Sequence, residues 1–191
     1  VLEVSRLEQG VAQRHIEWGP VAMPAIVRRV VQGLRQEILV KELRVKEEME
    51  DGLPPIPGDE RLLQLLVSNL VENAVKFTPR GGGVEVGLRA EEGSLVLSVK
   101  DDGIGIAEEH RERIFDKFFT VSDGASRTHG GAGIGLYLAR EVAAIHEGRI
   151  DVESAFERAD SWFLRWISQV LMSFPISGAR SWSRLRTTYG S

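Results

Sequence analysis

The sequence predicts an α+β fold in which helices cover one face of a single β-sheet. Amphipathic helical patterns alternate along the chain with short runs in which apolar and polar residues alternate. Hydrophobic residues make up 42% of the 191 residues, which is enough for one sizeable core. Helices and strands mixed in this order are typical of one sheet with helices packed on one side.

The composition excludes several classes of function. A formal net charge of −4 gives no electrostatic case for nucleic acid as a partner. The absence of cysteine excludes disulfides, thiolate zinc sites and a cysteine nucleophile, and it fits a reducing compartment. No apolar run approaches the ~20 residues of a membrane-spanning helix. Because the chain begins at Val1 without an initiator methionine or a signal peptide, we expect a fragment of a longer protein.

The N-terminal half predicts helices, one strand and one loop. Residues 1–10 have the spacing of the last turns of a helix, with glycine as a stop. Residues 23–39 form an amphipathic helix, and residues 43–49 alternate as a solvent-edged strand. Three prolines and two glycines in residues 51–58 predict a loop, because they disfavour helix and β-ladder alike.

The remaining elements begin with a helix for which Asp59 is a good N-cap. This helix ends near Phe77, because Thr78-Pro79 cannot continue it. The elements predicted after it are antiparallel strands at 81–89 and 93–101, a short helix around 110–119 within a polar region, a helix at 133–148, and strands at 148–154 and 161–167.

One stripe of the helix that starts at Asp59 is polar. Asn69, Asn73 and Lys76 stand at positions i, i+4 and i+7, so they lie along one line. Amide oxygens are ligands for a hard cation, and an ammonium group suits phosphate. Taken alone, the stripe is better interpreted as the solvated face of an ordinary amphipathic helix.

The segment "DDGIGI" follows a predicted strand. Asp101 ends this strand, and Gly103 and Gly105 allow tight turning and close approach of the backbone. A carboxylate only accepts hydrogen bonds, so it suits the exocyclic amino group of adenine and not the oxygen that guanine has there. The alternative is a tight turn made from good turn residues.

The segment "GGAGIGL" places Gly130, Gly131, Gly133 and Gly135 directly before a helix. Exposed amides and the positive end of the helix dipole favour phosphate binding at such a turn. The spacing is not that of a P-loop, and the segment does not follow a strand as a dinucleotide-binding fingerprint does. Taken alone, it is a weak signal.

Together, these motifs resemble the ATP-binding domain of sensor histidine kinases, whose superfamily includes gyrase, the ninety-kilodalton heat-shock chaperone and MutL. "NLVENAVKFTP" resembles the N box, "DDGIGI" the first glycine box, "IFDKFF" the F box and "GGAGIGL" the second glycine box. The resemblance implies a Bergerat-type fold, a two-layer α/β sandwich with a mixed sheet. It implies that residues 1–18 are the end of a dimerisation helix with a linker and that residues 19–167 are the catalytic domain. Residues 168–191 match nothing in the family, and we expect them to be a poorly ordered tail of unknown role.

The resemblance also implies roles for single residues. Asn73 would bind Mg²⁺ with Asn69 near it, and Lys76 would contact phosphate. Phe77 would pack against adenine, and Asp101 would accept its amino group. The other implied residues are Gly103 and Gly105 in the nucleotide wall, Gly131, Gly133, Gly135 and Leu136 at the phosphates and the lid hinge, Phe115, Phe118 and Phe119 as anchors of a lid over residues 107–130, and Lys117 or Arg127 as lid cations. Plain core packing is the alternative for the phenylalanines, and exposed loop charge is the alternative for the cations.

The position of Asn69 bears on the reaction. The hydrolytic members of the superfamily have a glutamate there that activates water, and an asparagine cannot take a proton at neutral pH. The γ-phosphoryl group of ATP would then await an imidazole from another domain, with catalysis by positioning and charge neutralisation. The chain's own histidines lack the context of a phosphoacceptor, and we interpret them as surface or packing residues: His15, His110, His129 and His146.

The expected function is therefore that of a sensor histidine kinase catalytic domain that uses ATP and Mg²⁺. Its expected partners are the dimerisation and phosphoacceptor helices of the same, homodimeric protein and a response regulator, in the cytoplasm or on the cytoplasmic side of a membrane-anchored sensor. Two alternatives stay open: a regulatory module that ATP only switches, and a serine kinase or ATPase of the anti-sigma type. Asn69 counts against an ATPase, and "SRLEQG" favours a sensor kinase.

Overall fold

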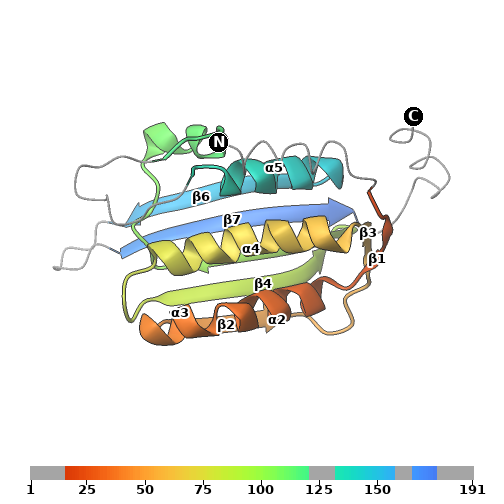
Figure 1. Cartoon of the computed structure of the whole chain (residues 1–191), viewed down its shortest axis with the longest axis horizontal. Helices are drawn as coiled ribbons and strands as arrows, with labels where there is room; N and C mark the ends of the chain where they lie inside the picture. The colour runs from red at the N-terminus through yellow and green to blue at the C-terminus, as the bar shows by residue number, and fades with distance from the viewer. Residues whose placement is uncertain (1–15, 121–131, 158–164, 176–191) are drawn as a thin grey trace.

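The computed structural model describes residues 16–120, 132–157 and 165–175 (Figure 1). Its elements are β1 (Gly19–Val21), α2 (Met23–Gly33), α3 (Arg35–Val40), β2 (Arg44–Met49), β3 (Ile56–Gly58), α4 (Glu60–Phe77), β4 (Gly83–Glu91), β5 (Ser94–Asp101), the 3₁₀ turns η1 (Glu108–His110) and η2 (Arg113–Phe115), α5 (Gly135–Ile145), β6 (Arg149–Glu157) and β7 (Arg165–Pro175). The helix expected in residues 1–10 and the end of the tail, 176–191, lie outside the described residues.

The main sheet has five strands in the order β2-β4-β5-β7-β6. β2 pairs with β4 in parallel, whereas every other neighbouring pair is antiparallel, so the sheet is mixed. Figure 1 shows α2, α4 and α5 side by side across one face of this sheet, with α4 in the middle. The predicted α+β class, with helices on one face of a mixed sheet, is confirmed.

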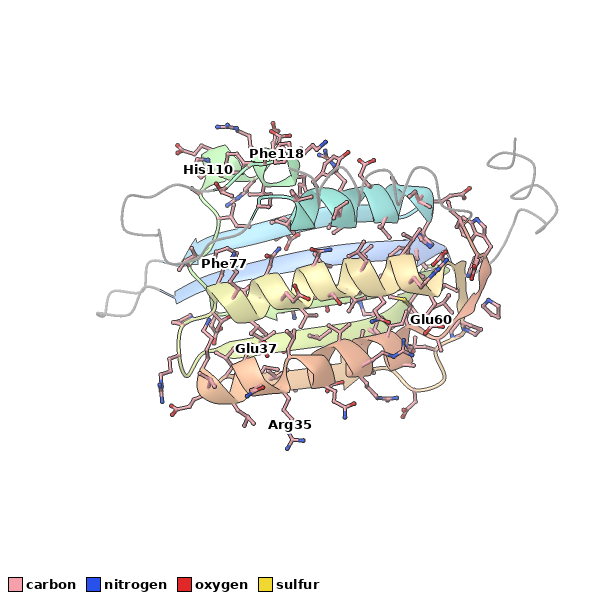
Figure 2. The ribbon with its side chains drawn as sticks, in the orientation of Figure 1. Arg35, Glu37, Glu60, Phe77, His110 and Phe118 are labelled. Carbon is pink, nitrogen blue, oxygen red and sulfur yellow. The ribbon has the colours of Figure 1, made fainter. Side chains whose placement is uncertain are left out.

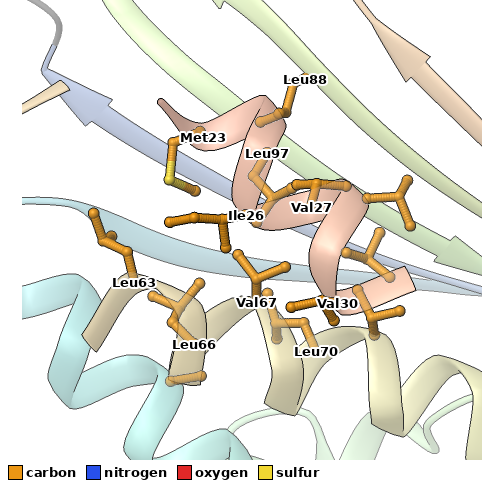
Figure 3. Close-up of a cluster of buried hydrophobic side chains, with 14 of the residues drawn as sticks. Met23, Ile26, Val27, Val30, Leu63, Leu66, Val67, Leu70, Leu88 and Leu97 are labelled. Carbon is orange, nitrogen blue, oxygen red and sulfur yellow. The ribbon is translucent and has the colours of Figure 1, made fainter. Parts of the chain in front are cut away.

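The core lies between this helical layer and the sheet. The apolar stripes of α2 and α4 meet there, with Ile26 and Val67 fully buried (Figure 3). Leu88 and Leu97 from paired positions of β4 and β5 close the core from the sheet side. Because α4 packs against α2, α5 and the sheet together, its remaining polar stripe has a fixed direction.

Both predicted ends of α4 are confirmed. Asp59 caps the N-terminus, where its Oδ1 accepts hydrogen bonds from the backbone N–H groups of Arg61 (2.9 Å) and Leu62 (3.2 Å). The helix ends at Phe77 because Thr78, which precedes a proline, is extended at φ −73° and ψ 129°.

The structure corrects several predicted elements. The helix expected at 23–39 is interrupted at Leu34, so that α2 and α3 are separate. The segment expected to be only a loop, 51–58, contains β3, which pairs with β1. Pro57 lies opposite Pro20, and a pair without N–H groups can occupy the non-hydrogen-bonded position of an antiparallel ladder.

Further differences lie in the C-terminal half. The short helix expected around 110–119 is two 3₁₀ turns, η1 and η2. The last strand does not end near residue 167, because β7 continues through Pro175 and places Phe174 in the core with 1% of its surface exposed. Among the described residues, no helix is both long and apolar enough to cross a bilayer.

Candidate functional site

The polar stripe of α4 lies beside the core. Asn69, Asn73 and Lys76 are half-buried, whereas Leu70 and Ala74 between them are buried. Asn69 donates a hydrogen bond from Nδ2 to the carbonyl of Leu65, four residues earlier (2.8 Å), and this bond fixes its amide. The stripe therefore presents amide groups in a partly desolvated setting.

The first glycine box packs against the C-terminal end of α4. Asp101 is the last residue of β5, and its Oδ1 accepts a hydrogen bond from the N–H of Gly103 (2.8 Å). A Cβ added at Gly103 would lie 3.1 Å from the carbonyl oxygen of Phe77, so the turn fits only because this position is glycine. Gly105 has φ +69°, a left-handed conformation that also favours glycine. Figure 2 shows Phe77 at this end of α4.

Burial raises the pKa of the Asp101 carboxyl to about 6. The N–H of Gly103 opposes the shift, and the neighbouring charge of Asp102 adds to it. Asp101 is therefore a partly desolvated carboxylate at neutral pH, and such a group gains from a ligand that donates a hydrogen bond to it.

The second glycine box brings the N-terminus of α5 against the middle of α4. A Cβ added at Gly135 would lie 2.6 Å from Oδ1 of Asn69. The N-cap residue of this helix is Ile134, and no side-chain cap is seen within the part of the chain that the structure describes, so the first N–H groups of the helix are not used by a cap there. An uncapped helix N-terminus beside polar amides can bind an anionic group.

The two glycine boxes thus meet the same helix at two places. Phe77 follows Asn69 by eight residues, which is about 12 Å along a helix axis. The structure therefore brings together the N box and both glycine boxes, although they are far apart in the sequence. The nucleotide contacts assigned to these residues stay predictions.

The F box is joined to the second glycine box through the backbone. Phe118 donates its N–H to the carbonyl of Gly133 (2.9 Å), and a Cβ at Gly133, which has φ +66°, would lie 2.6 Å from the carbonyl oxygen of Phe119. Phe115 is buried and has the guanidinium of Arg140 5.8 Å from its ring centroid. The F box and the second glycine box therefore cannot move independently without losing the hydrogen bond between Phe118 and Gly133.

The other predicted lid residues differ in their surroundings. The side chain of Phe118, labelled in Figure 2, is 56% exposed, so it does not anchor the segment as expected. Nζ of Lys117 lies 5.3 Å from the Phe118 ring and 5.9 Å from the Tyr137 ring. Leu136 packs against the edge of the core. Gly131 and Arg127 lie outside the described residues.

Two polar residues next to the site were missed by the sequence reasoning. Asp102 accepts a hydrogen bond from the N–H of Gly83 (3.0 Å) and donates its own N–H to the Gly83 carbonyl (2.9 Å), which fixes the end of β5. Lys41 donates to two carbonyls in the last turn of α4. No local motif signals either contact, because each partner is distant in the sequence.

Among the described residues, no group of three or more histidine or acidic side chains could hold a metal ion. The amide oxygens of Asn69 and Asn73 are the groups of the stripe that fit a hard cation, and Mg²⁺ commonly keeps few protein ligands when phosphate oxygens supply the others. The site therefore suits a metal that arrives with a phosphate ligand.

Residues 58–168 match the family model described as histidine kinase-, DNA gyrase B- and HSP90-like ATPase. The chain is 32% identical over 176 residues to the sensor histidine kinase RppB of Synechocystis sp., which covers 92% of this chain and 38% of that protein. It is 36% identical over 150 residues to the sensor-like histidine kinase SenX3 of Mycolicibacterium smegmatis, which covers 78% of this chain and 38% of that protein. The chain thus spans well under half the length of these relatives.

Solved structures have the same fold. The catalytic domain of histidine kinase ThkA has a TM-score of 0.69 at 22% identity and covers 84% of this chain and 98% of its own. Full-length ShkA in complex with AMPPNP has a TM-score of 0.69 at 27% identity and covers 86% of this chain and 32% of its own. The motifs, the fold and these matches agree: the chain belongs to the histidine kinase-, DNA gyrase B- and HSP90-like ATPase family, within its histidine kinase branch.

Proposed function

We propose that this chain binds Mg²⁺-ATP and donates the γ-phosphoryl group to a histidine on a separate helical domain of the same protein. The observation that carries the proposal is the convergence of both glycine boxes on the polar stripe of α4. One box packs Gly103 against the backbone of Phe77 and bonds it to the half-buried Asp101 carboxylate, and the other brings the start of α5 to Asn69.

At the end of α4, Asp101 would select the base. Its carboxylate accepts a hydrogen bond from the exocyclic amino group of adenine, whereas guanine would present an oxygen to it. The half-buried ring of Phe77 offers an apolar face on which the base can stack. Lys76, whose Nζ lies 4.9 Å from the Phe77 ring centroid, is close enough to that ring to place a positive charge beside the nucleotide.

At the middle of α4, the chain would hold the phosphates. Asn73, with Asn69 near it, would supply amide oxygens to Mg²⁺, which neutralises charge on the phosphates when it is bound. The N–H groups at the start of α5 would donate hydrogen bonds to phosphate oxygens. Lys117 stays a proposed phosphate contact of the lid.

In this proposal, Asn69 decides between hydrolysis of ATP and transfer of its γ-phosphoryl group. A neutral amide cannot deprotonate water, so hydrolysis lacks a base at this position. An imidazole is a nucleophile that needs no such base, and positioning with charge neutralisation is then sufficient for in-line transfer. The site thus favours transfer to histidine over hydrolysis.

The relatives support the partners we propose. RppB and SenX3 are described as sensor histidine kinases, and a structure of ThkA in complex with the response regulator TrrA has a TM-score of 0.67 with this chain. We propose that the full-length protein is a homodimer whose helical hairpin carries the phosphoacceptor histidine and that a response regulator receives the phosphoryl group. We propose the cytoplasm as the location of this domain.

The test uses γ-³²P-labelled ATP, the 191-residue chain and a separately produced helical hairpin domain from the full-length protein. We expect label on the hairpin domain that is lost in acid and retained in base, which is characteristic of phosphohistidine. Label on the chain itself that survives acid would indicate a serine kinase. Binding of ATP without any transfer would contradict the kinase proposal and favour a regulatory module that ATP only switches.

A further inference from the structure

A lysine outside the four boxes holds the end of α4. Lys41 lies between α3 and β2, and its Nζ donates hydrogen bonds to the carbonyls of Val75 (2.7 Å) and Lys76 (2.8 Å). Both acceptors belong to the last turn of α4, 34 and 35 residues away. The turn that carries two predicted nucleotide contacts is thus bonded to a residue from another element.

The end of α4 needs such a donor. Helix C-termini leave their last carbonyls without intrahelical partners, and a following glycine in a left-handed conformation commonly satisfies them. Thr78 is extended here and serves only the carbonyl of Ala74, through its N–H (3.0 Å) and its hydroxyl (2.6 Å). Lys41 serves the next two carbonyls, and a cation at this end also interacts favourably with the helix dipole.

The backbone of Lys41 is bonded to the segment that leaves the helix. Its carbonyl accepts a hydrogen bond from the N–H of Gly81 (2.9 Å), and the N–H of Arg44 donates to the carbonyl of Gly82 (2.9 Å). Side chain and main chain of Lys41 therefore connect the end of α4, the following turn and the start of β2.

Lys41 is half-buried, and its ammonium group is held by carbonyls and not by an acid. Partial burial lowers its pKa. No ion pair between described residues includes Lys41, whereas Lys46 on the adjacent strand pairs with Glu48. The partners of Lys41 are the two helix carbonyls.

The bonded turn lies directly under the nucleotide site. A Cβ at Gly103 would lie 3.1 Å from the carbonyl oxygen of Phe77, so the first glycine box packs on the residue that follows the two acceptors of Lys41. A small displacement of this turn would move Phe77 and Lys76 relative to Asp101. A displacement of about 1 Å is sufficient to weaken binding when several groups must contact one ligand together.

We infer that Lys41 is a positioning residue of the nucleotide site, which acts by fixing the last turn of α4 against the first glycine box. This inference rests on the proposed nucleotide-binding function. In this role Lys41 contacts the helix carbonyls, and no contact with the nucleotide is required. It fixes the position of the helical turn whose residues Phe77 and Lys76 would contact the nucleotide.

The test compares Lys41→Met, which keeps the aliphatic stem but removes the donors, with Lys41→Arg, which keeps a cationic donor. Lys46→Met is the matched control, because it removes the same charge from an exposed ion pair on β2, the strand that follows Lys41. Titration calorimetry of fully folded protein at low temperature gives the Kd for Mg²⁺-ATP. We expect Lys41→Met to raise Kd on the order of tenfold, Lys41→Arg to recover most of the loss, and Lys46→Met to leave Kd unchanged.

Amide hydrogen exchange without nucleotide provides the second measurement. Lys41→Met should speed exchange at Thr78 and Gly81 relative to the parent and to Lys46→Met. Unchanged exchange would overturn the bonding role of Lys41, and changed exchange with an unchanged Kd would overturn its link to the site. If the parent itself bound no Mg²⁺-ATP, the proposed function would fail, while the exchange data would still decide the structural role of Lys41.

Discussion

Among the individual side chains, Asp101 shows the conflict between binding and stability most directly. Its carboxyl is partly desolvated, and its pKa is raised to about 6 in the nucleotide-free chain. A folded-state pKa above the unfolded value contributes stability at low pH that is lost as the pH rises through 6. At neutral pH the fold therefore holds a charge that destabilises it, and shifted groups of this kind cluster at binding and catalytic sites.

Asp101→Asn removes this charge and keeps an oxygen that can accept the hydrogen bond of Gly103. We expect Kd for Mg²⁺-ATP to rise about ten- to a hundredfold, because a hydrogen bond to a charged acceptor becomes a neutral one. We also expect Tm without nucleotide at pH 7.5 to rise by about 2–4 °C. Calorimetry and a thermal melt measure the two effects. A variant that binds ATP as tightly as the parent would contradict the adenine assignment.

The glycines of the second box allow an equally specific change. Gly135→Ala adds a methyl group 2.6 Å from Oδ1 of Asn69, so that amide must rotate away from its present position. Because a side chain gives way and the backbone does not, we expect the fold to survive and Kd for Mg²⁺-ATP to rise about tenfold.

Gly33→Ala is the control for this variant, since nothing lies within 4 Å of the added atom. Its Kd should equal that of the parent. Equal affinity of Gly135→Ala and Gly33→Ala would remove the contact between α5 and Asn69 from the account of the phosphate site.

Among the secondary-structure elements, α4 is held at both ends by residues that are distant in the sequence. At its start, Asp59 accepts a hydrogen bond at Oδ2 from the N–H of Glu17 (2.9 Å) and donates its own N–H to Nε2 of His146 (3.0 Å). The His146 ring lies 5.2 Å from that of Trp18. At its end, Lys41 donates hydrogen bonds to the carbonyls of Val75 and Lys76. The helix that presents the site therefore does not depend on its own sequence alone.

His146 makes the stability of this arrangement depend on pH. Burial lowers the pKa of its imidazole, although the carbonyl of Val142 and the charge of Asp59 partly oppose this. Because Nε2 accepts the N–H of Asp59, the neutral ring is the form that fits. The stability it contributes is complete above the unfolded pKa of about 6.5 and is lost as pH falls towards the lower folded value.

We therefore expect the free energy of unfolding in urea to fall by up to about 1.4 kcal/mol per pH unit below pH 6.5 through this one group. His146→Gln, which keeps an acceptor but does not titrate, should be less stable at pH 7.5 and have a shallower dependence on pH. Asp101 changes the stability with pH in the opposite direction, but it does so equally in parent and variant. The difference between the two curves therefore isolates His146. Parallel curves for parent and variant would contradict this role.

For the complete fold, local patterns predicted most elements and the boxes that meet at the site. Asp59, with Pro79 after Phe77, predicted both ends of α4, and the strand before Asp101 placed this carboxylate at a strand end. These features depend on capping, proline geometry and alternation, which act over a few residues. They are readable from a single sequence for that reason.

The features that were missed depend on pairing between distant segments. β3 forms by pairing with β1, in which Pro57 lies opposite Pro20, and the length of β7 depends on its pairing with β5, which buries Phe174. The contacts of Lys41 span more than 30 residues. The exposure of Phe118 could not be predicted either, because an aromatic residue in the F box suggests burial unless the surrounding packing is known.

The most direct test of the account is calorimetric titration of the folded 191-residue chain with nucleotides, in Mg²⁺ and in excess EDTA, beside Asn73→Ala. We predict binding of Mg²⁺-ATP, at least tenfold weaker binding of Mg²⁺-GTP because Asp101 faces the wrong group, and loss of the Mg²⁺ dependence in Asn73→Ala. No heat with Mg²⁺-ATP, or equal affinity for the two nucleotides, would contradict the claim that this site reads adenine and holds a metal-bound triphosphate.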